Sequence, residues 1–218
     1  MASTINYWVS TNGNWGSTSS WSLGTVPNGE PIVFDGERSQ QPVTTIGGGT
    51  ANFYLMRVLD NYRGDIGAIN DRLIVGNPVG GGSKCYIHHG GPGRMFLERS
   101  VEANPVFLLC DSANPVDAVS MIGPAAGGTT SVYMRRGRGY FGDGLILQDF
   151  KQDPISDALT ISHIEGNSTL RGSLKINGGT AFLGLVDLHP SVYDPRFIIN
   201  GGQAIYRGTA DVGRLDLN

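Results

Sequence analysis

The chain has few cysteines, few charged residues and no long apolar run, and each shortage excludes a class of protein. Two cysteines among 218 residues, Cys85 and Cys110, are too few for the disulfide framework of a small secreted domain. We expect both to be buried as small apolar side chains. Charged residues make up 16% of the chain, which is too little for a disordered polyelectrolyte. No apolar run reaches the roughly 18 residues of a membrane helix, so we expect no membrane contact.

The N-terminus and the charge balance narrow the setting further. Residues 1–8 contain no basic segment followed by an apolar stretch, so no signal peptide is indicated and we expect synthesis without export by that route. The net charge of −3 gives no overall positive field that would attract nucleic acid. The basic residues are mostly arginine, since only Lys84, Lys151 and Lys175 are lysines. A preference for arginine over lysine is typical of protein interfaces.

Helical periodicity is also nearly absent. The best helical candidates, residues 101–110 and 145–156, contain Pro105 and Pro154, so we expect at most a turn or two there. Instead, β-branched and aromatic runs alternate with turn residues, among them 33 glycines and 11 prolines. This pattern favours many short strands joined by tight turns. Strands are predicted at residues 31–35, 43–46, 53–59, 72–75, 84–88, 95–98, 106–110, 118–122, 131–134 and 144–148.

A recurring frame in the last third of the chain makes the fold more specific. An apolar residue, a polar residue, glycine, three variable positions and an apolar residue begin at Ile164, Ile176 and Ile199, with an imperfect copy at Ile46. The steps of 12 and 23 residues suit the rungs of a β-solenoid, with glycine at the corners. We expect the apolar residues before and after each corner to point inward. A β-sandwich or jelly roll also has strands that recur every 8–12 residues, and it stays the alternative.

The first 36 residues differ from the rest. They contain all three tryptophans, Trp8, Trp15 and Trp21. A solenoid end exposes strand edges and an open core, so we interpret residues 1–36 as a cap on a solenoid body of residues 37–218, within a single domain. The alternative role for these indoles is a flat platform for sugar rings.

The spacing W-x6-W-x5-W-x4-V-P-N-G, followed by an apolar strand that ends at Asp35, resembles the start of right-handed parallel β-helices. Such openings occur in bacterial surface proteins of the autotransporter type and in phage virion proteins. The bacterial surface versions carry a signal peptide and run several hundred residues longer, and this sequence shows neither feature. The resemblance therefore implies a short right-handed parallel β-helix from a phage particle, most like a capsid decoration or cement protein.

Residues that carry chemistry are scattered. A glycosidase needs two carboxylates about 5 to 10 Å apart, and stacked rungs would bring acidic side chains together only if they clustered. We interpret the candidates as solvated turn residues: Asp143, Asp149, Asp153, Glu165 and Asp187. His88 and His89 are adjacent, so on a strand they point to opposite faces and cannot share a metal ion; we expect both to be exposed in a turn. The glycines before Lys84 lack the spacing of a phosphate loop. The sequence thus predicts no enzyme, no cofactor and no metal site.

The segment from Arg135 to Tyr140 is the one dense basic patch. Arg135, Arg136 and Arg138 can grip carboxylates in bidentate fashion, so two interpretations stay open: contact with an acidic partner surface, or a solvated loop.

These observations lead to a functional prediction. We expect a structural protein on the capsid surface of a phage, made in the host cytoplasm, that binds the major capsid protein or another virion protein as a homotrimer. The partner contacts would come from Arg135, Arg136 and Arg138, with Trp8, Trp15 and Trp21 as the cap or anchor. The alternatives are a carbohydrate-binding tail-fibre or adhesin module and a polysaccharide-cleaving β-helix enzyme.

Overall fold

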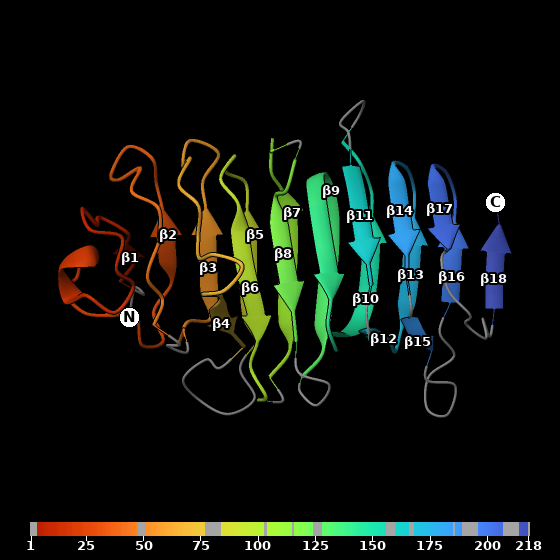
Figure 1. The fold of residues 1–218 in the computed structure, drawn as a ribbon, viewed down its shortest axis with the longest axis horizontal. Coiled ribbons are helices and arrows are strands. Elements are labelled where there is room, and N and C mark those ends of the chain that lie inside the picture. Colours follow the sequence, from red (N-terminus) through yellow and green to blue (C-terminus); the bar gives the residue numbers. More distant parts are fainter. Residues whose placement is uncertain are drawn as a thin grey trace.

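The chain winds into a coil whose turns add strands to two parallel sheets (Figure 1). The first sheet consists of β1 (Asn6–Tyr7), β2 (Ile32–Phe34), β3 (Leu55–Val58), β5 (Cys85–His89), β7 (Val106–Asp111), β10 (Ile146–Gln152), β12 (Ser168–Leu170), β13 (Ser173–Ile176), β15 (Val186–Leu188), β16 (Arg196–Ile199) and β18 (Arg214–Leu217). The second sheet consists of β4 (Leu73–Val75), β6 (Met95–Arg99), β8 (Val119–Ile122), β11 (Thr160–Ile164), β14 (Thr180–Leu183) and β17 (Gln203–Tyr206). The long strand β9 (Thr130–Gly142) runs through both.

This arrangement comes from a computed structural model. It describes residues 4–47, 51–76, 84–102, 104–114, 116–123, 128–155, 160–165, 168–184, 186–188, 196–206 and 214–217.

The strand pairing confirms the solenoid and excludes the sandwich. Every pairing between named strands is parallel, whereas sandwiches and jelly rolls are built from antiparallel strands. The coil makes about 7 turns. One turn lengthens or shortens with its loops, so that Leu55 pairs with Tyr86 but Ser131 already pairs with Asp149. The protein is thus an all-β parallel solenoid, as its recurring frame predicted.

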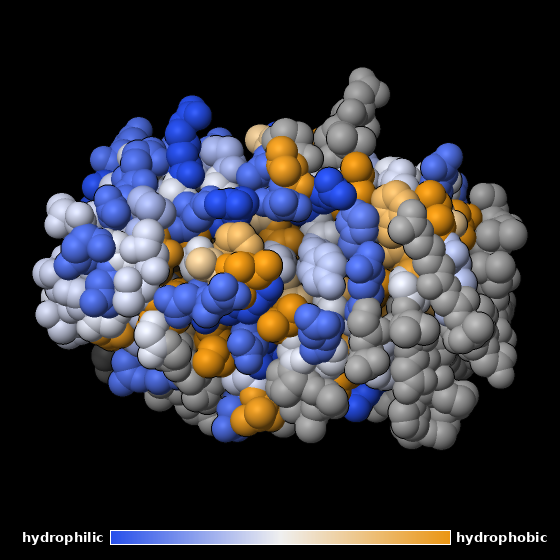
Figure 2. Space-filling view, viewed as in Figure 1, coloured by the Kyte–Doolittle hydropathy of each residue, from blue (hydrophilic) through white to orange (hydrophobic). Residues whose placement is uncertain are grey.

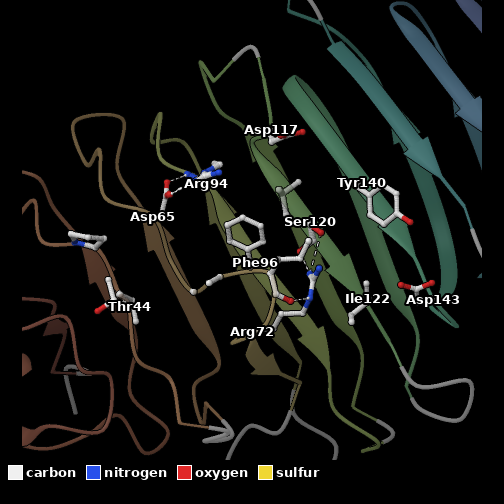
Figure 3. Close-up of a pocket in the computed structure, with 16 residues that line it drawn as sticks. Thr44, Asp65, Arg72, Arg94, Phe96, Asp117, Ser120, Ile122, Tyr140 and Asp143 are labelled. Atoms are coloured by element: carbon white, nitrogen blue, oxygen red, sulfur yellow. Dashed lines mark hydrogen bonds and ion pairs between the residues drawn. The ribbon is translucent and has the colours of Figure 1, made fainter.

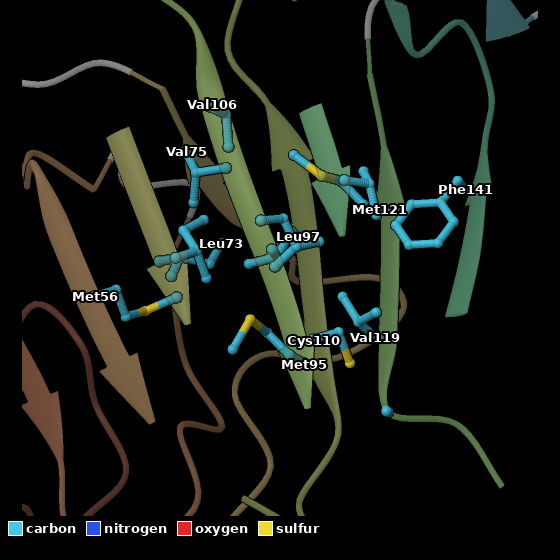
Figure 4. Packing of buried hydrophobic residues seen from close by; sticks show 14 of the residues in the cluster. Met56, Leu73, Val75, Met95, Leu97, Val106, Cys110, Val119, Met121 and Phe141 are labelled. Carbon is cyan, nitrogen blue, oxygen red and sulfur yellow. The ribbon is translucent and has the colours of Figure 1, made fainter. Parts of the chain in front are cut away.

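The core lies between the two sheets. Along β7, Val106, Leu108 and Cys110 are buried, while Phe107 and Leu109 between them point outward, as the two-residue period of a strand requires. Figure 4 shows the buried side chains of both sheets meeting in this space. One continuous apolar core therefore runs along the coil.

The strand β9 turns the corner between the sheets without a break. Gly137 has a φ of 93°, a left-handed conformation that is costly for a residue with a Cβ atom. Just before it the register shifts, since Cys110 pairs with Met134 but Asp111 pairs with Arg136. This bulge leaves two consecutive side chains, Arg135 and Arg136, outside the core.

The recurring frame marks the corners. Ile176 pairs with Ile199, 23 residues later, and Asn200 Nδ2 donates a hydrogen bond of 2.8 Å to Asn177 Oδ1 on the rung before. Ile164 ends a strand of the second sheet and Ile176 ends one of the first, so the 12-residue step is one half-turn.

One detail of the frame was wrong. We expected the apolar residue after each corner to point inward, but Phe182 and Ile205 point outward. In β14 the buried positions belong to Ala181 and Leu183. The strand restarts after the corner with Thr180 outside, so its two-residue period places Phe182 outside as well.

The N-terminal cap is present. Trp8, Trp15 and Trp21 are 0%, 2% and 2% exposed, and the ring of Trp21 lies edge-on to the other two at centroid distances of 5.1 and 4.8 Å. Phe34 of β2 continues the cluster, with its centroid 5.7 Å from that of Trp8. Residues 1–36 thus share one core with the turns that follow.

Helices are almost absent from the described residues. They contain only the short 3-10 helix η1 (Thr18–Ser20), and none of them forms a helix long and apolar enough to cross a membrane. The two segments that we allowed a helical turn instead contain β7 and β10.

Candidate functional site

The tryptophans are committed to the cap. Trp8 Nε1 donates to the Gln41 carbonyl at 2.8 Å, and Trp21 Nε1 donates to the Trp15 carbonyl at 2.9 Å. Because their polar atoms are bonded and their rings are buried, none of the three offers a flat face to a sugar or to a partner. We therefore propose no contact role for them.

The three arginines lie on a strand and do not form one patch. Arg135 and Arg136 flank Asp111 of β7, at 3.8 and 3.3 Å, and Arg136 Nη2 also donates to the Asp111 carbonyl at 2.8 Å. Arg138 lies beyond the corner at Gly137 and contacts His163 Nε2 at 3.1 Å. The solvated loop was therefore wrong. The side chains of Arg135 and Arg136 are still 39% and 40% exposed, so both remain accessible at the edge of the first sheet.

The candidate carboxylates are divided between the two outer faces. On the first sheet, Asp149 accepts hydrogen bonds from the Ser173 backbone N and Oγ at 2.9 and 2.8 Å. Asp153 pairs with Lys151 at 2.8 Å. Hydrogen bonds from Lys151, Asn177 and Tyr133 lower the pKa of Asp153 to about 2, which is opposite to the raised pKa that a glycosidase acid needs.

The other acidic candidates lie elsewhere. Asp143 and Glu165 both raise the pKa of Tyr140 on the second sheet, after the larger effect of its burial. Glu165 lies 3.4 Å from His163 Nδ1. The side chain of Asp187 lies outside the described residues, as do residues 80–83 before Lys84.

The prediction for the two histidines was wrong. Both belong to β5 rather than to a turn, and His89 is buried while His88 is half-buried. Burial lowers the pKa of His89 to about 4, and His89 Nε2 bonds the Gly93 carbonyl at 3.0 Å. They do point to opposite faces, as their adjacency required.

The cysteines are buried and free. They lie on the neighbouring strands β5 and β7, but Cys85 pairs with Val106 and Cys110 pairs with His89, at opposite ends of the ladder. Four residues of strand separate them, roughly 13 Å, which is too far for a disulfide. Burial raises the pKa of each thiol to about 12, so neither is a nucleophile.

A strip of apolar and aromatic side chains covers the middle of the first sheet on its outer face. We name it the aromatic strip; its members are Leu55, Tyr86, Phe107, Leu109 and Tyr133, and they line a shallow hollow of about 460 Å³. Tyr86 and Phe107 stack with their ring centroids 5.1 Å apart, and Tyr86 is 43% exposed. Sequence reasoning missed the strip because it looked for runs of residues. The signal was the alternate, outward position in three strands that the sequence had placed.

Charged side chains border the aromatic strip. The Nζ atom of Lys84 lies 5.5 Å from the Phe107 ring centroid, and that of Lys151 lies 4.6 Å from the Tyr133 ring centroid. The ion pairs of Arg135 and Arg136 with Asp111 come from the same two strands, β7 and β9, as Phe107 and Tyr133. An aromatic centre with a charged, arginine-bearing rim is the usual composition of a protein interface.

The outer face of the second sheet carries a different feature, a polar groove of about 940 Å³. Figure 3 shows Arg72, Arg94, Asp117, Tyr140 and Asp143 around it. We name it the second-sheet groove.

No candidate metal centre and no known relative accompanies these surfaces. Among the described residues, no three His, Cys, Asp or Glu side chains are grouped to hold a metal ion. Comparison of the chain with protein-family models, with curated proteins and with solved structures gave no match.

Proposed function

We propose that the protein is a structural component of a phage particle, specifically a decoration protein that binds the assembled head through the aromatic strip. The observation that carries this proposal is the strip itself, an outward-facing stack of Tyr86 and Phe107 inside a charged rim. Aromatic side chains bury large areas with little loss of conformational entropy. A rigid parallel sheet holds them without further ordering, which favours binding.

The mechanism is mass action. A partner that binds the assembled shell and not its free subunits stabilises the shell by its binding free energy, repeated at every symmetric site. We propose the major capsid protein or another virion protein as the partner and a homotrimer as the bound form, because closed rings of head-to-tail contacts fit sites of three-fold symmetry.

Two variants of equal chemistry test the role of the strip. Phe107→Ser removes the centre of the aromatic strip, whereas Phe182→Ser removes a half-buried ring on the second sheet that stacks on His163 at 4.7 Å. We expect Phe107→Ser to reduce binding to heads that lack the protein at least tenfold, and Phe182→Ser to bind as the wild type does. Sedimentation of heads with added protein measures both. Equal binding by the two variants would contradict the proposal.

The enzymatic alternative has its own test. Turnover of a polysaccharide by the purified protein, abolished by a single substitution such as Glu165→Gln with the fold intact, would replace the structural function with a catalytic one.

A further inference from the structure

The second-sheet groove is long and follows the axis of the solenoid. Its floor comes from the same position in five successive turns: Thr44, Gly67, Phe96, Ser120 and Tyr140. Since neighbouring strands lie about 4.8 Å apart, these five positions span about 19 Å, the length of about four sugar rings. Figure 2 views the molecule from the same side as Figure 1 and shows apolar residues near the middle of this face, among hydrophilic ones. The groove thus fits an extended chain better than a compact molecule.

Arg72 supplies a positive charge in the groove that no carboxylate neutralises. It is half-buried, and its Nη1 donates to the Leu97 carbonyl, the Ser120 carbonyl and Ser120 Oγ at 3.3, 3.3 and 3.1 Å. Within the described part of the chain, no carboxylate lies within ion-pair distance of it. Arg94, in contrast, is paired with Asp65 at 2.6 Å. The groove therefore presents one guanidinium held by neutral oxygens.

Two carboxylates in the groove are also without a cationic partner among the described residues. Asp117 and Asp143 are both exposed and form no ion pair there. Asp143 is the one non-glycine residue of the described ranges with a positive φ, 51°. Backbone strain of this kind concentrates at binding sites, where the surrounding structure maintains it. The groove thus combines acceptors at Asp117 and Asp143 with a donor at Arg72.

Two rings complete the groove. Phe96 lies between the guanidinium groups of Arg72 and Arg94, whose Cζ atoms are 5.9 and 5.5 Å from its centroid. Tyr140 adds a phenol that stays neutral, because burial raises its pKa. A neutral phenol both donates and accepts a hydrogen bond.

The mixture of groups selects the chemistry of the ligand. An acidic chain is repelled by Asp117 and Asp143, and a basic chain by Arg72. Hydroxyl groups both donate and accept hydrogen bonds, so a neutral chain that carries many of them satisfies both kinds of side chain. A peptide in strand form gains less, because the backbone groups of β6, β8 and β9 beneath it already pair with each other.

From these features we propose that the second-sheet groove binds a neutral carbohydrate chain of about four sugar units along the solenoid axis. This site is separate from the aromatic strip, since the two lie on opposite sheets. It is also separate from the buried tryptophans.

Calorimetric titration with defined oligosaccharides tests the proposal. The probes are the neutral hexasaccharides of glucose in α-1,4 and β-1,4 linkage, of mannose and of N-acetylglucosamine, with the matching disaccharides and the hexamer of galacturonic acid. We expect at least one neutral hexasaccharide to bind, its disaccharide to bind at least tenfold more weakly, and the galacturonate hexamer to bind more weakly than the neutral chain.

Three variants place the binding site. Asp117→Asn removes a charge that makes no ion pair in the structure, so its fold is safe, and we expect at least threefold weaker binding. Arg72→Met is expected to weaken binding at least tenfold, and Tyr86→Ala on the aromatic strip is expected to change nothing. Lack of binding by every neutral hexasaccharide, or binding unaffected by both Asp117→Asn and Arg72→Met, would overturn the proposal. Loss of binding only in Tyr86→Ala would move the sugar site to the strip.

Discussion

His89 shows how a single side chain makes this fold sensitive to pH. It is 1% exposed, and burial lowers its pKa to about 4. The folded protein therefore keeps His89 neutral, whereas in the unfolded chain it takes up a proton with a pKa near 6.5. A proton that binds only the unfolded chain favours unfolding.

The stability of the fold should fall as the pH falls from about 6.5 to 4 and should be constant for this group above about pH 7, with a total loss of up to about 3 kcal/mol. Urea unfolding at a series of pH values measures this. His89→Gln is expected to be less stable at pH 7 but to lose most of the slope. His88→Gln should keep most of it, because His88 is half-buried. Asp153 adds its own loss only below about pH 4, where its lowered pKa matters. A slope that is unchanged in His89→Gln would contradict the assignment.

At this scale the sequence predicted burial better than contact. Cys85 and Cys110 were expected in the core and are buried, and the tryptophans form the expected cap. His89 was misplaced because its flanking glycines suggested a turn, while the two-residue period of β5 actually continues through it. The arginines were recognised as a cluster, but nothing in their spacing shows that Gly137 turns the strand between Arg136 and Arg138.

The corner in β9 is the element on which the two sheets depend. Gly137 combines a φ of 93° with close neighbours, since a Cβ atom there would lie 2.9 Å from both the Ala118 Cβ and the Ser112 carbonyl. Gly24 has a φ of 68° but nothing within 4 Å of such an atom. The two positions separate backbone strain from crowding.

Gly24→Ala should destabilise the protein by about 1 kcal/mol through its left-handed backbone alone. Gly137→Ala should cost about 1–3 kcal/mol more, because overpacking adds to the strain. Chemical denaturation of the two variants beside the wild type gives the difference. Equal losses in both would show that the corner adjusts freely and that the close contacts at Gly137 carry no energy.

Strand positions were the most predictable elements. The ten short runs chosen from β-branched residues and turns all contain a strand or, at residues 43–46, isolated bridges. The second half of β9 was missed, because the arginines and glycines of residues 135–139 have low strand propensity. Their pairing partners in β8 and β11 impose the extended conformation, and that information lies outside any local window.

The whole molecule is a stack of similar turns that presents two unlike outer faces. The first sheet carries the aromatic strip with its charged rim, and the second carries the polar groove. Because each turn contacts mainly its neighbours, a side chain on one face can change without disturbing the other. This independence allows one short solenoid to bind a protein partner and a second ligand at the same time.

The recurring frame and the tryptophan spacing predicted the solenoid, but neither outer face was visible in them. A face consists of alternate residues from strands that are 18 to 31 positions apart, such as Ser131 with Asp149 and Leu55 with Tyr86. Its composition depends on register, which irregular loop lengths conceal. The functional surfaces therefore emerge only after the strands are stacked.

The number of copies of this chain on a purified phage particle tests the proposed function most directly. Quantitative mass spectrometry of intact particles, with the major capsid protein as internal standard, measures it. The proposal predicts hundreds of copies, in a fixed ratio to the capsid protein and lost when the heads are treated to release surface proteins. A handful of copies would assign the protein to the tail, and none at all would contradict a structural role in the particle.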